Sequence, residues 1–145
     1  MTDLTALLTR VDAATGPDRQ IDCLLDCLRT GREFIEWTAD TGIVGYRFKH
    51  HTLGWELGCW RVGYTASLDA ALALVTKMLP GWRWSIGTIQ SNGGDYAQLA
   101  EPVMTEFGPG IGIRAQQHAA TPPLAVLSAL LRALIAKQEV ADVHR

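Results

Sequence analysis

The segment from 64 to 84, YTASLDAALALVTKMLPGWRW, constrains the fold more than any other part of the sequence. Ser67 is suited to cap a helix, and the apolar residues that follow it recur at helical spacing. Pro80 and Gly81 end this helix. The next residues alternate as they do in a strand, with Trp82 and Trp84 on one side. The segment therefore predicts a helix that runs directly into a strand.

The first 31 residues predict a pair of amphipathic helices, separated by Gly16 and Pro17. Their apolar faces are formed by Leu4, Leu7, Leu8 and Val11 and by Ile21, Leu24, Leu25 and Leu28. We expect this pair to lie outside the main core.

Between 34 and 62 the apolar period changes to two, which is typical of strands. Val44, Tyr46 and Phe48 share one face of a first strand, and Trp55, Leu57 and Cys59 share one face of a second. Residues 50–54 would connect them as a hairpin. Residues 34–37 either add a short edge strand or lie over the core.

The C-terminal half predicts three further strands and a final helix. Asn92 and Gly93 mark a hairpin turn, a strand follows over about 96–101, and the Gly/Pro-rich residues 107–113 lead into a short strand at about 111–117. Thr121 and Pro122 begin a helix.

The whole pattern predicts one α+β domain over 1–145, an alpha/beta sandwich in the order α-α-β-β-α-β-β-β-α. Its mainly antiparallel sheet would be packed by the helices at 67–79 and 121–138, with a loose tail at 139–145.

The final helix is apolar nearly all round. Val126, Leu130 and Ala133 lie opposite the face formed by Leu124, Leu127, Leu131 and Leu134. A helix of this kind is either sandwiched within the chain or buries a second face in a partner. We expect a homo-oligomer.

Charge and composition exclude several classes of protein. The 15 acidic and 13 basic residues are scattered and give a net charge of −2, so nucleic acid is not an expected partner. The strand and helix order from 67 to 138 matches a double-stranded RNA-binding domain, but no cation stands at 121–126 where that module grips phosphate. No apolar run is long enough to span a bilayer, and the three cysteines, without a CxxC, fit a cytoplasmic protein.

Residues able to carry chemistry are present but are not arranged as a site. His50 and His51 are adjacent and diverge on an extended backbone, and no serine lies in a GxSxG motif. Cys23 and Cys27 lack a second ligand pair and are expected to be packing residues. We therefore predict no catalytic residue, metal or cofactor, and a protein that is not an enzyme.

Aromatic residues are concentrated between 37 and 84, with arginines interleaved. Indole and guanidinium groups stack together, and arginine adds charge-assisted hydrogen bonds. The predicted site for a nucleotide or a partner surface consists of Trp60, Arg61, Arg83 and Trp84.

Three stretches resemble small uncharacterised phage and prophage proteins of the phage ABA (alpha-beta-alpha) sandwich type: YTASLDAALALV at 64–75, PGWRW at 80–84 and AATPPLAVLSALLRAL at 119–134. GPDRQID at 16–22 is a weaker fourth. The resemblance implies this fold and a phage setting in the host cytoplasm, and it carries over no catalytic residue.

Two hypotheses follow. The first is a non-enzymatic phage accessory protein that binds and inhibits or sequesters a host protein or nucleotide signal, with antiviral immunity as the most interesting target. The alternative is an oligomeric module that binds a small molecule or nucleotide.

Overall fold

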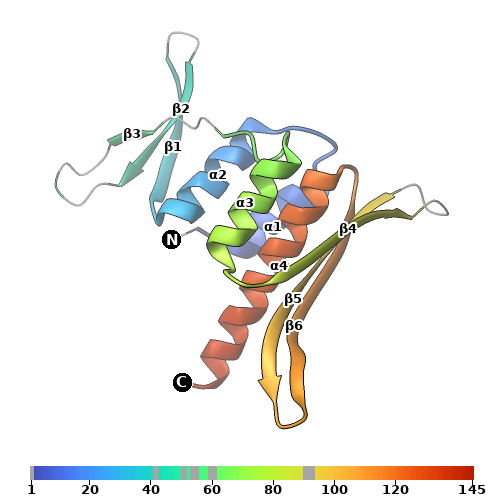
Figure 1. Ribbon diagram of the computed structural model, residues 1–145. Coiled ribbons are helices and arrows are strands. Elements are labelled where there is room, and N and C mark those ends of the chain that lie inside the picture. The colour runs from blue at the N-terminus through green and yellow to red at the C-terminus, as the bar shows by residue number, and fades with distance from the viewer. Residues whose placement is uncertain (1, 41–42, 50–51, 53–55, 59–61, 90–93) are drawn as a thin grey trace.

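A computed structural model describes residues 2–145 except 41–42, 50–51, 53–55, 59–61 and 90–93. Its described residues form an α+β fold of helices and two antiparallel sheets, which confirms the predicted class (Figure 1). The helices are α1 (Leu4–Ala13), α2 (Arg19–Thr30), α3 (Leu68–Met78) and α4 (Pro122–Val143). The strands are β1 (Glu33–Asp40), β2 (Ile43–Lys49), β3 (Glu56–Gly58), β4 (Arg83–Ile89), β5 (Gly94–Thr105) and β6 (Gly108–Ala119).

The helix ends follow the local sequence closely. Ser67 caps α3 by accepting from the Ala70 N–H, and Thr121 caps α4 with Pro122 at its first position. Gly31 ends α2 in the left-handed conformation, with φ of 72°. The predicted tail differs, because residues 139–143 continue α4 as exposed helix instead of forming a loose segment.

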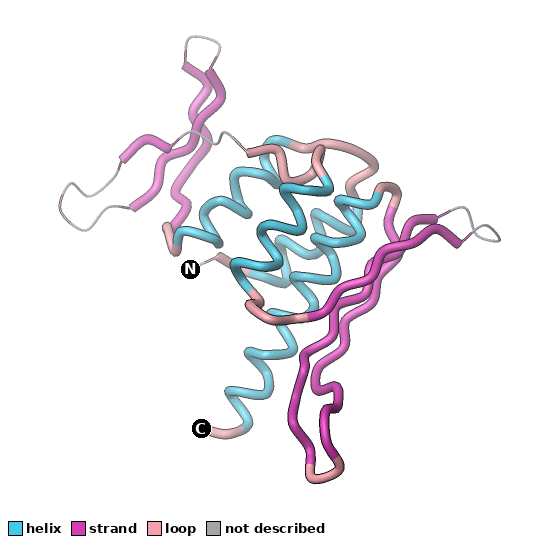
Figure 2. The backbone as a smooth tube through the Cα atoms, in the orientation of Figure 1, coloured by secondary structure: helices cyan, strands magenta, loops and turns pink. Residues whose placement is uncertain are grey.

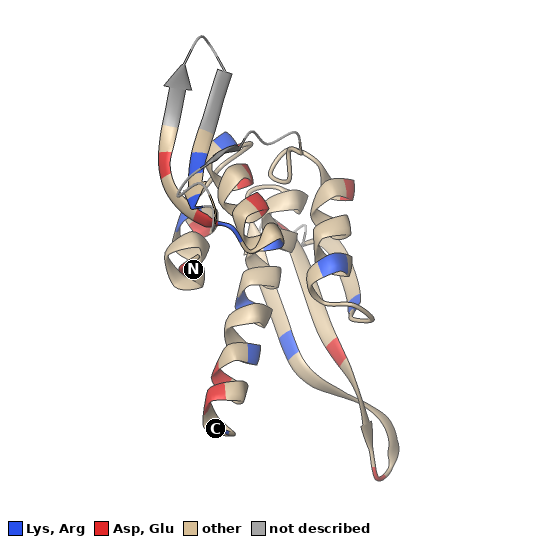
Figure 3. Ribbon diagram, turned by 90° about the vertical axis from the view of Figure 1, so that its left-hand side faces the viewer, with Lys and Arg blue, Asp and Glu red and all other residues tan. Residues whose placement is uncertain are grey.

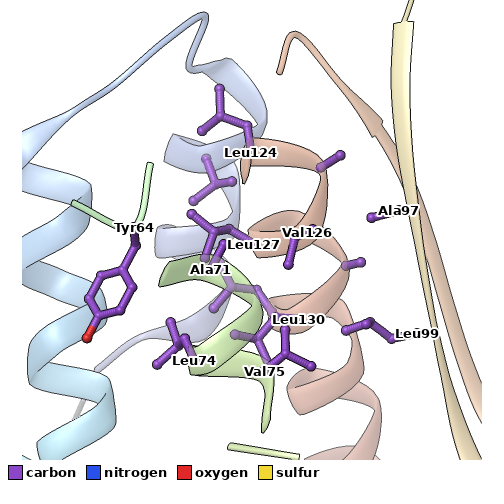
Figure 4. Close-up of a cluster of buried hydrophobic side chains, with 14 of the residues drawn as sticks. Tyr64, Ala71, Leu74, Val75, Ala97, Leu99, Leu124, Val126, Leu127 and Leu130 are labelled. Atoms are coloured by element: carbon purple, nitrogen blue, oxygen red, sulfur yellow. The ribbon is translucent and has the colours of Figure 1, made fainter. Parts of the chain in front are cut away.

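Helix α4 is the centre of the molecule. One side packs on β5 and β6, and the other sides contact α1 and α3. In Figure 4, Val126 and Leu130 lie between Leu99 of β5 and the side chains of α3. The residues predicted to face a second copy, Val126, Leu130 and Ala133, are each 0% exposed. The chain's own helices therefore bury the second apolar face, which removes the reason for expecting an oligomer.

The placement of α1 and α2 corrects a second prediction. Leu7 and Val11 of α1 and Ile21 and Leu25 of α2 belong to the same core cluster as α4. The N-terminal pair is therefore part of the main core and not outside it. Helix α3 packs mainly on α4, so the layer next to the second sheet is formed chiefly by α4.

The first sheet has the order β1-β2-β3 and projects from one end of the helical body (Figure 2). The antiparallel pairing of β2 with β3 confirms the predicted hairpin. Residues 34–37, for which the sequence allowed either an edge strand or a segment over the core, lie in the eight-residue strand β1. Tyr46 and Phe48 of β2 pack on Cys23 and Cys27 of α2 in a small separate core. This sheet is thus held to the body by one helix.

The second sheet has the order β4-β5-β6. Strands β5 and β6 are twelve residues each and pair over almost their full length, with an irregularity between Ala100 and Pro102. Both strands are longer than predicted, because Gly108 and Pro109 stand within the pairing, opposite Thr105 and Met104. The far half of this hairpin projects away from the helical core, in the same direction as the last turns of α4, and is called the arm here, residues 102–111 (Figure 1).

Candidate functional site

The predicted tryptophan and arginine site does not form one surface in the described residues. Trp60 and Arg61 lie outside the part of the chain that the structure describes. Arg83 and Trp84 are both exposed, but they are consecutive in β4 and point to opposite faces of the sheet. Trp84, 51% exposed, pairs with Leu99 and so lies on the face that α4 covers. Arg83 lies on the other face.

That other face, called the outer face here, carries three rows of side chains across the sheet. The register of the strands places Arg83, Ala100 and Arg114 in one row. Ser85, Gln98 and Gln116 form the next row, and Gly87, Tyr96 and His118 form the third. The helix α4 packs on the opposite face, where Ala97, Leu99 and Ala115 are buried. The outer face is therefore open and polar among the described residues. These nine residues include no carboxylate, but the carboxylate of Glu101 lies next to them on the same face, over Gly112 of β6.

The arginine row has a small residue at its centre. Neighbouring strands lie about 4.8 Å apart, so the Cα atoms of Arg83 and Arg114 are about 10 Å apart on either side of Ala100. Both arginines are exposed, and neither makes a hydrogen bond or ion pair with any residue that the structure describes. The row thus presents two guanidinium groups on either side of the small Ala100 side chain.

The tyrosine row depends on a glycine. The Tyr96 ring crosses β4 at Gly87, where a Cβ atom would lie 2.6 Å from Cε1 of the ring. Because Gly87 has no side chain, the ring can lie down along the sheet. On its other side Tyr96 contacts His118, with ring centroids 6.0 Å apart. The two rings are tilted by 50° to each other and form an aromatic pair at the end of the sheet opposite to the arm.

The arm exposes large apolar side chains. Phe107 is 93% exposed at its tip and Met104 is 78% exposed beside it. Ile111 is half exposed, and the register places it opposite Pro102. On the opposite side of the arm from Met104 and Ile111, the side chains of Val103 and Thr105 lie over Gly110. A Cβ atom at Gly110 would be 2.9 Å from Thr105 Cγ2. The glycines of β6 make the arm thin, with apolar groups turned to solvent.

A groove of about 960 Å³ runs between the start of α1, the end of α2 and the last turns of α4. Leu4, Leu28 and Ile135 contribute to its apolar lining. Glu33, Glu139 and Asp142 are among its acidic residues, with Arg32 as the lining cation. This excess of acidic over basic lining residues suits an apolar or cationic ligand better than an anion.

Tyr46 anchors the first sheet through buried polar groups. Its hydroxyl donates to Asp26 Oδ2 at 2.9 Å and accepts from Arg32 Nη1 at 3.0 Å. Arg29 donates to the other oxygen of Asp26 at 2.8 Å. Arg32 also lies over the Phe48 ring, 4.3 Å from its centroid. Burial raises the pKa of Tyr46, which keeps the phenol protonated.

Other buried polar groups also join elements. Asp22 Oδ1 accepts from the Thr65 N–H at 2.7 Å, and burial raises the pKa of this carboxyl. Asp12 of α1 accepts from Ser128 at 2.5 Å and from Arg132 at 2.8 Å, both on α4. These hydrogen bonds hold helices and loops together, which is a structural role.

The cysteine pair is also structural. Cys23 and Cys27 are 0% exposed, one helical turn apart, in the small core under the first sheet. A hydrogen bond to Cys27, together with burial, raises the pKa of Cys23. No group of three or more His, Cys, Asp or Glu residues able to hold a metal occurs among the residues that the structure describes.

The described helices include none that is long and apolar enough to cross a membrane. Charged residues of both signs are interspersed along the helices in Figure 3. Comparison with protein-family models, with curated proteins and with solved structures gives no match. The resemblance to phage ABA sandwich proteins stays a prediction.

Sequence reasoning selected Arg83, did not select His118, and missed Arg114 and Tyr96. The alternation of polar and small residues through β5 and β6 was a usable signal for an open sheet face. It was not usable alone, because the register that aligns Arg114 with Arg83 across Ala100 depends on the irregular pairing beyond Ala100.

Proposed function

We propose that this protein is a non-enzymatic phage accessory protein that binds a host protein in the host cytoplasm and inhibits or sequesters it, with antiviral immunity as the target system of most interest. The phage setting rests on the resemblance of residues 64–84 and 119–134. The binding role rests on one observation, the exposed apolar arm. Phe107 and Met104 are two of the three most exposed large apolar side chains among the described residues, and they lie together on the arm.

Apolar groups of this size are costly to leave in water, and contiguous ones on a soluble surface commonly mark an interaction site. Phenylalanine and methionine are also enriched at protein interfaces. The arm projects away from the helical core, so its tip is placed to enter a recess of a partner protein. A binding role also fits the structural engagement of Asp12, Asp22 and Asp26.

The test compares an arm variant carrying Met104→Ser and Phe107→Ser with Val143→Ser. Val143 is 80% exposed at the end of α4, so its replacement removes exposed apolar surface away from the arm. Each tagged protein is incubated with host lysate, and retained proteins are quantified by mass spectrometry. We expect a host protein retained by the wild type and the Val143 variant and lost from the arm variant. Equal retention by all three, or retention of no host protein, would contradict the proposal.

The alternative is an oligomeric module that binds a small molecule, for which the groove of about 960 Å³ is the supporting observation. Its size is near the upper end of ordinary ligand sites. In this alternative the arm would join copies of the chain. Light scattering would then show a mass above the monomer that falls in the arm variant but not in Val143→Ser, and mass spectrometry would find a retained small molecule in place of a host protein.

A further inference from the structure

We propose that the outer face of the second sheet binds a short single-stranded nucleic acid, with a phosphate between Arg83 and Arg114 and a base against Tyr96 and His118. This site is separate from the arm and does not depend on the function proposed for it. The proposal rests on the three rows of side chains, the absence of a helix over them and their charge.

The arginine row has the chemistry of a phosphate site. Two guanidinium groups stand about 10 Å apart at their Cα atoms and can converge over Ala100, whose small side chain leaves room between them. Arginine binds phosphate oxygens through paired N–H donors. Because both groups are exposed and make no bond within the described chain, neither must break one to bind a ligand.

The tyrosine row has the chemistry of a base platform. Tyr96 lies four residues from Ala100 along β5, which is about 13 Å. Its ring lies along the sheet over Gly87 and is supported by His118. Aromatic rings that lie flat on a sheet stack bases without requiring a particular sequence. Gln98 and Gln116, in the row between, offer amide donors and acceptors for base edges.

The shape of the outer face favours a single-stranded nucleic acid over a free nucleotide as the ligand. A small ligand needs a concave site that encloses most of its surface, and this face is an open sheet. A strand gains its binding energy from contacts spread along such a face. The net charge of −2 argues against a broad nucleic-acid surface, yet the nine residues of this face carry two arginines and no carboxylate. The Glu101 carboxylate next to them, over Gly112, already accepts from the Ile113 N–H.

The experiment measures fluorescence anisotropy of a labelled oligothymidylate about ten nucleotides long, within the site sizes of sheet-based binders. Tyr96→Ala should weaken binding about tenfold through lost stacking. Arg83→Ala and Arg114→Ala should each weaken it, and each should reduce the slope of log Kd against log salt by about 0.7. Gly87→Ala should weaken binding with every charge kept, because its Cβ displaces the Tyr96 ring. Arg19→Ala, an exposed arginine on α2, is the control and should bind as the wild type.

Circular dichroism and thermal melting of each variant show that the fold is kept. No saturable binding by the wild type would overturn the proposal, as would an equal loss in the Arg19 variant. If single nucleotides displace the labelled oligonucleotide at the same concentration as unlabelled oligonucleotide does, the ligand is a free nucleotide. The proposal of a single-stranded nucleic acid would then be wrong. If only the arm variant of Met104 and Phe107 loses binding, the outer face is not the site.

Discussion

Tyr46 shows how one side chain fastens a sheet to a helix. Its hydroxyl is the only atom of β2 that bonds to both Asp26 and Arg32 in the described part of the chain. Tyr46→Phe keeps the ring in the small core but leaves Asp26 with one partner fewer. We expect a loss of about 1–3 kcal/mol in the free energy of unfolding, measured by urea denaturation.

Tyr96→Phe is the matched control for this change, because the Tyr96 hydroxyl lies at the half-buried surface and makes no hydrogen bond with the residues that the structure describes. The loss in the free energy of unfolding caused by Tyr96→Phe should be close to zero. Equal costs for the two variants would mean that the network at Asp26 does not stabilise the fold.

Asp22 predicts a pH dependence of stability. Burial raises the pKa of this carboxyl above its unfolded value of 3.8, so the folded chain holds the proton at pH values where the unfolded chain has lost it. The free energy of unfolding contributed by Asp22 is therefore highest below the unfolded pKa and falls as the pH rises through the folded pKa.

Other carboxylates change stability over the same range, so the measurement is a difference between the wild type and Asp22→Asn. The asparagine oxygen can still accept from the Thr65 N–H. We expect the advantage of the wild type over the variant to grow as the pH falls from neutral to about 4. A constant difference in denaturant melts at both pH values would show that Asp22 is not linked to folding.

At the scale of elements, α4 carries the largest share of the core. Leu131 is 0% exposed, and Leu131→Ala should cost about 2–5 kcal/mol as a cavity-forming change. The helical spacing of Leu68, Leu72 and Val75 predicts that Leu72 is an equal core residue. In the structure it is only partly buried in α3, where Leu74 is the buried leucine.

The cost of Leu72→Ala should therefore be clearly smaller than that of Leu131→Ala when both are measured by chemical denaturation. Leu74→Ala, at 2% exposure, should resemble the Leu131 variant. If Leu72→Ala were the costliest of the three, the faces of α3 would be assigned the wrong way round.

At the scale of the whole molecule, the two sheets are supported unequally. The second sheet packs on α4 within the main core. Among the residues whose burial the structure describes, the first sheet packs on α2 through the buried Cys23, Cys27, Tyr46 and Phe48, with Phe34 and Trp37 partly buried beside them. Local opening is easiest where few buried contacts must be broken. We expect hydrogen exchange to be faster in β1 and β2 than in the part of β5 and β6 that faces α4.

Exchange measured by mass spectrometry on peptides covering 33–49 and 94–119 tests this expectation. Tyr46→Phe should speed exchange in the first peptide and leave the second unchanged. Equal protection of both sheets in the wild type would show that the molecule opens only as a single cooperative unit.

Local patterns in the sequence were enough to place most elements. Ser67, Thr121 and Gly31 act within one helical turn of themselves, so their roles as caps and stop were readable without the fold. The alternation of apolar residues likewise located strands in both sheets. The lengths of β5 and β6 were misjudged, since strand pairing carried Gly108 and Pro109 into the ladder, and the end of α4 was placed too early.

The partners of each face were decided by the tertiary structure. The sequence showed that α4 is apolar all round, but only packing showed that α1, α3 and the second sheet bury it within one chain. The candidate site depended on register in the same way. Arg83 and Arg114 are 31 positions apart and meet across Ala100 because two strand pairings align them, which no local pattern encodes.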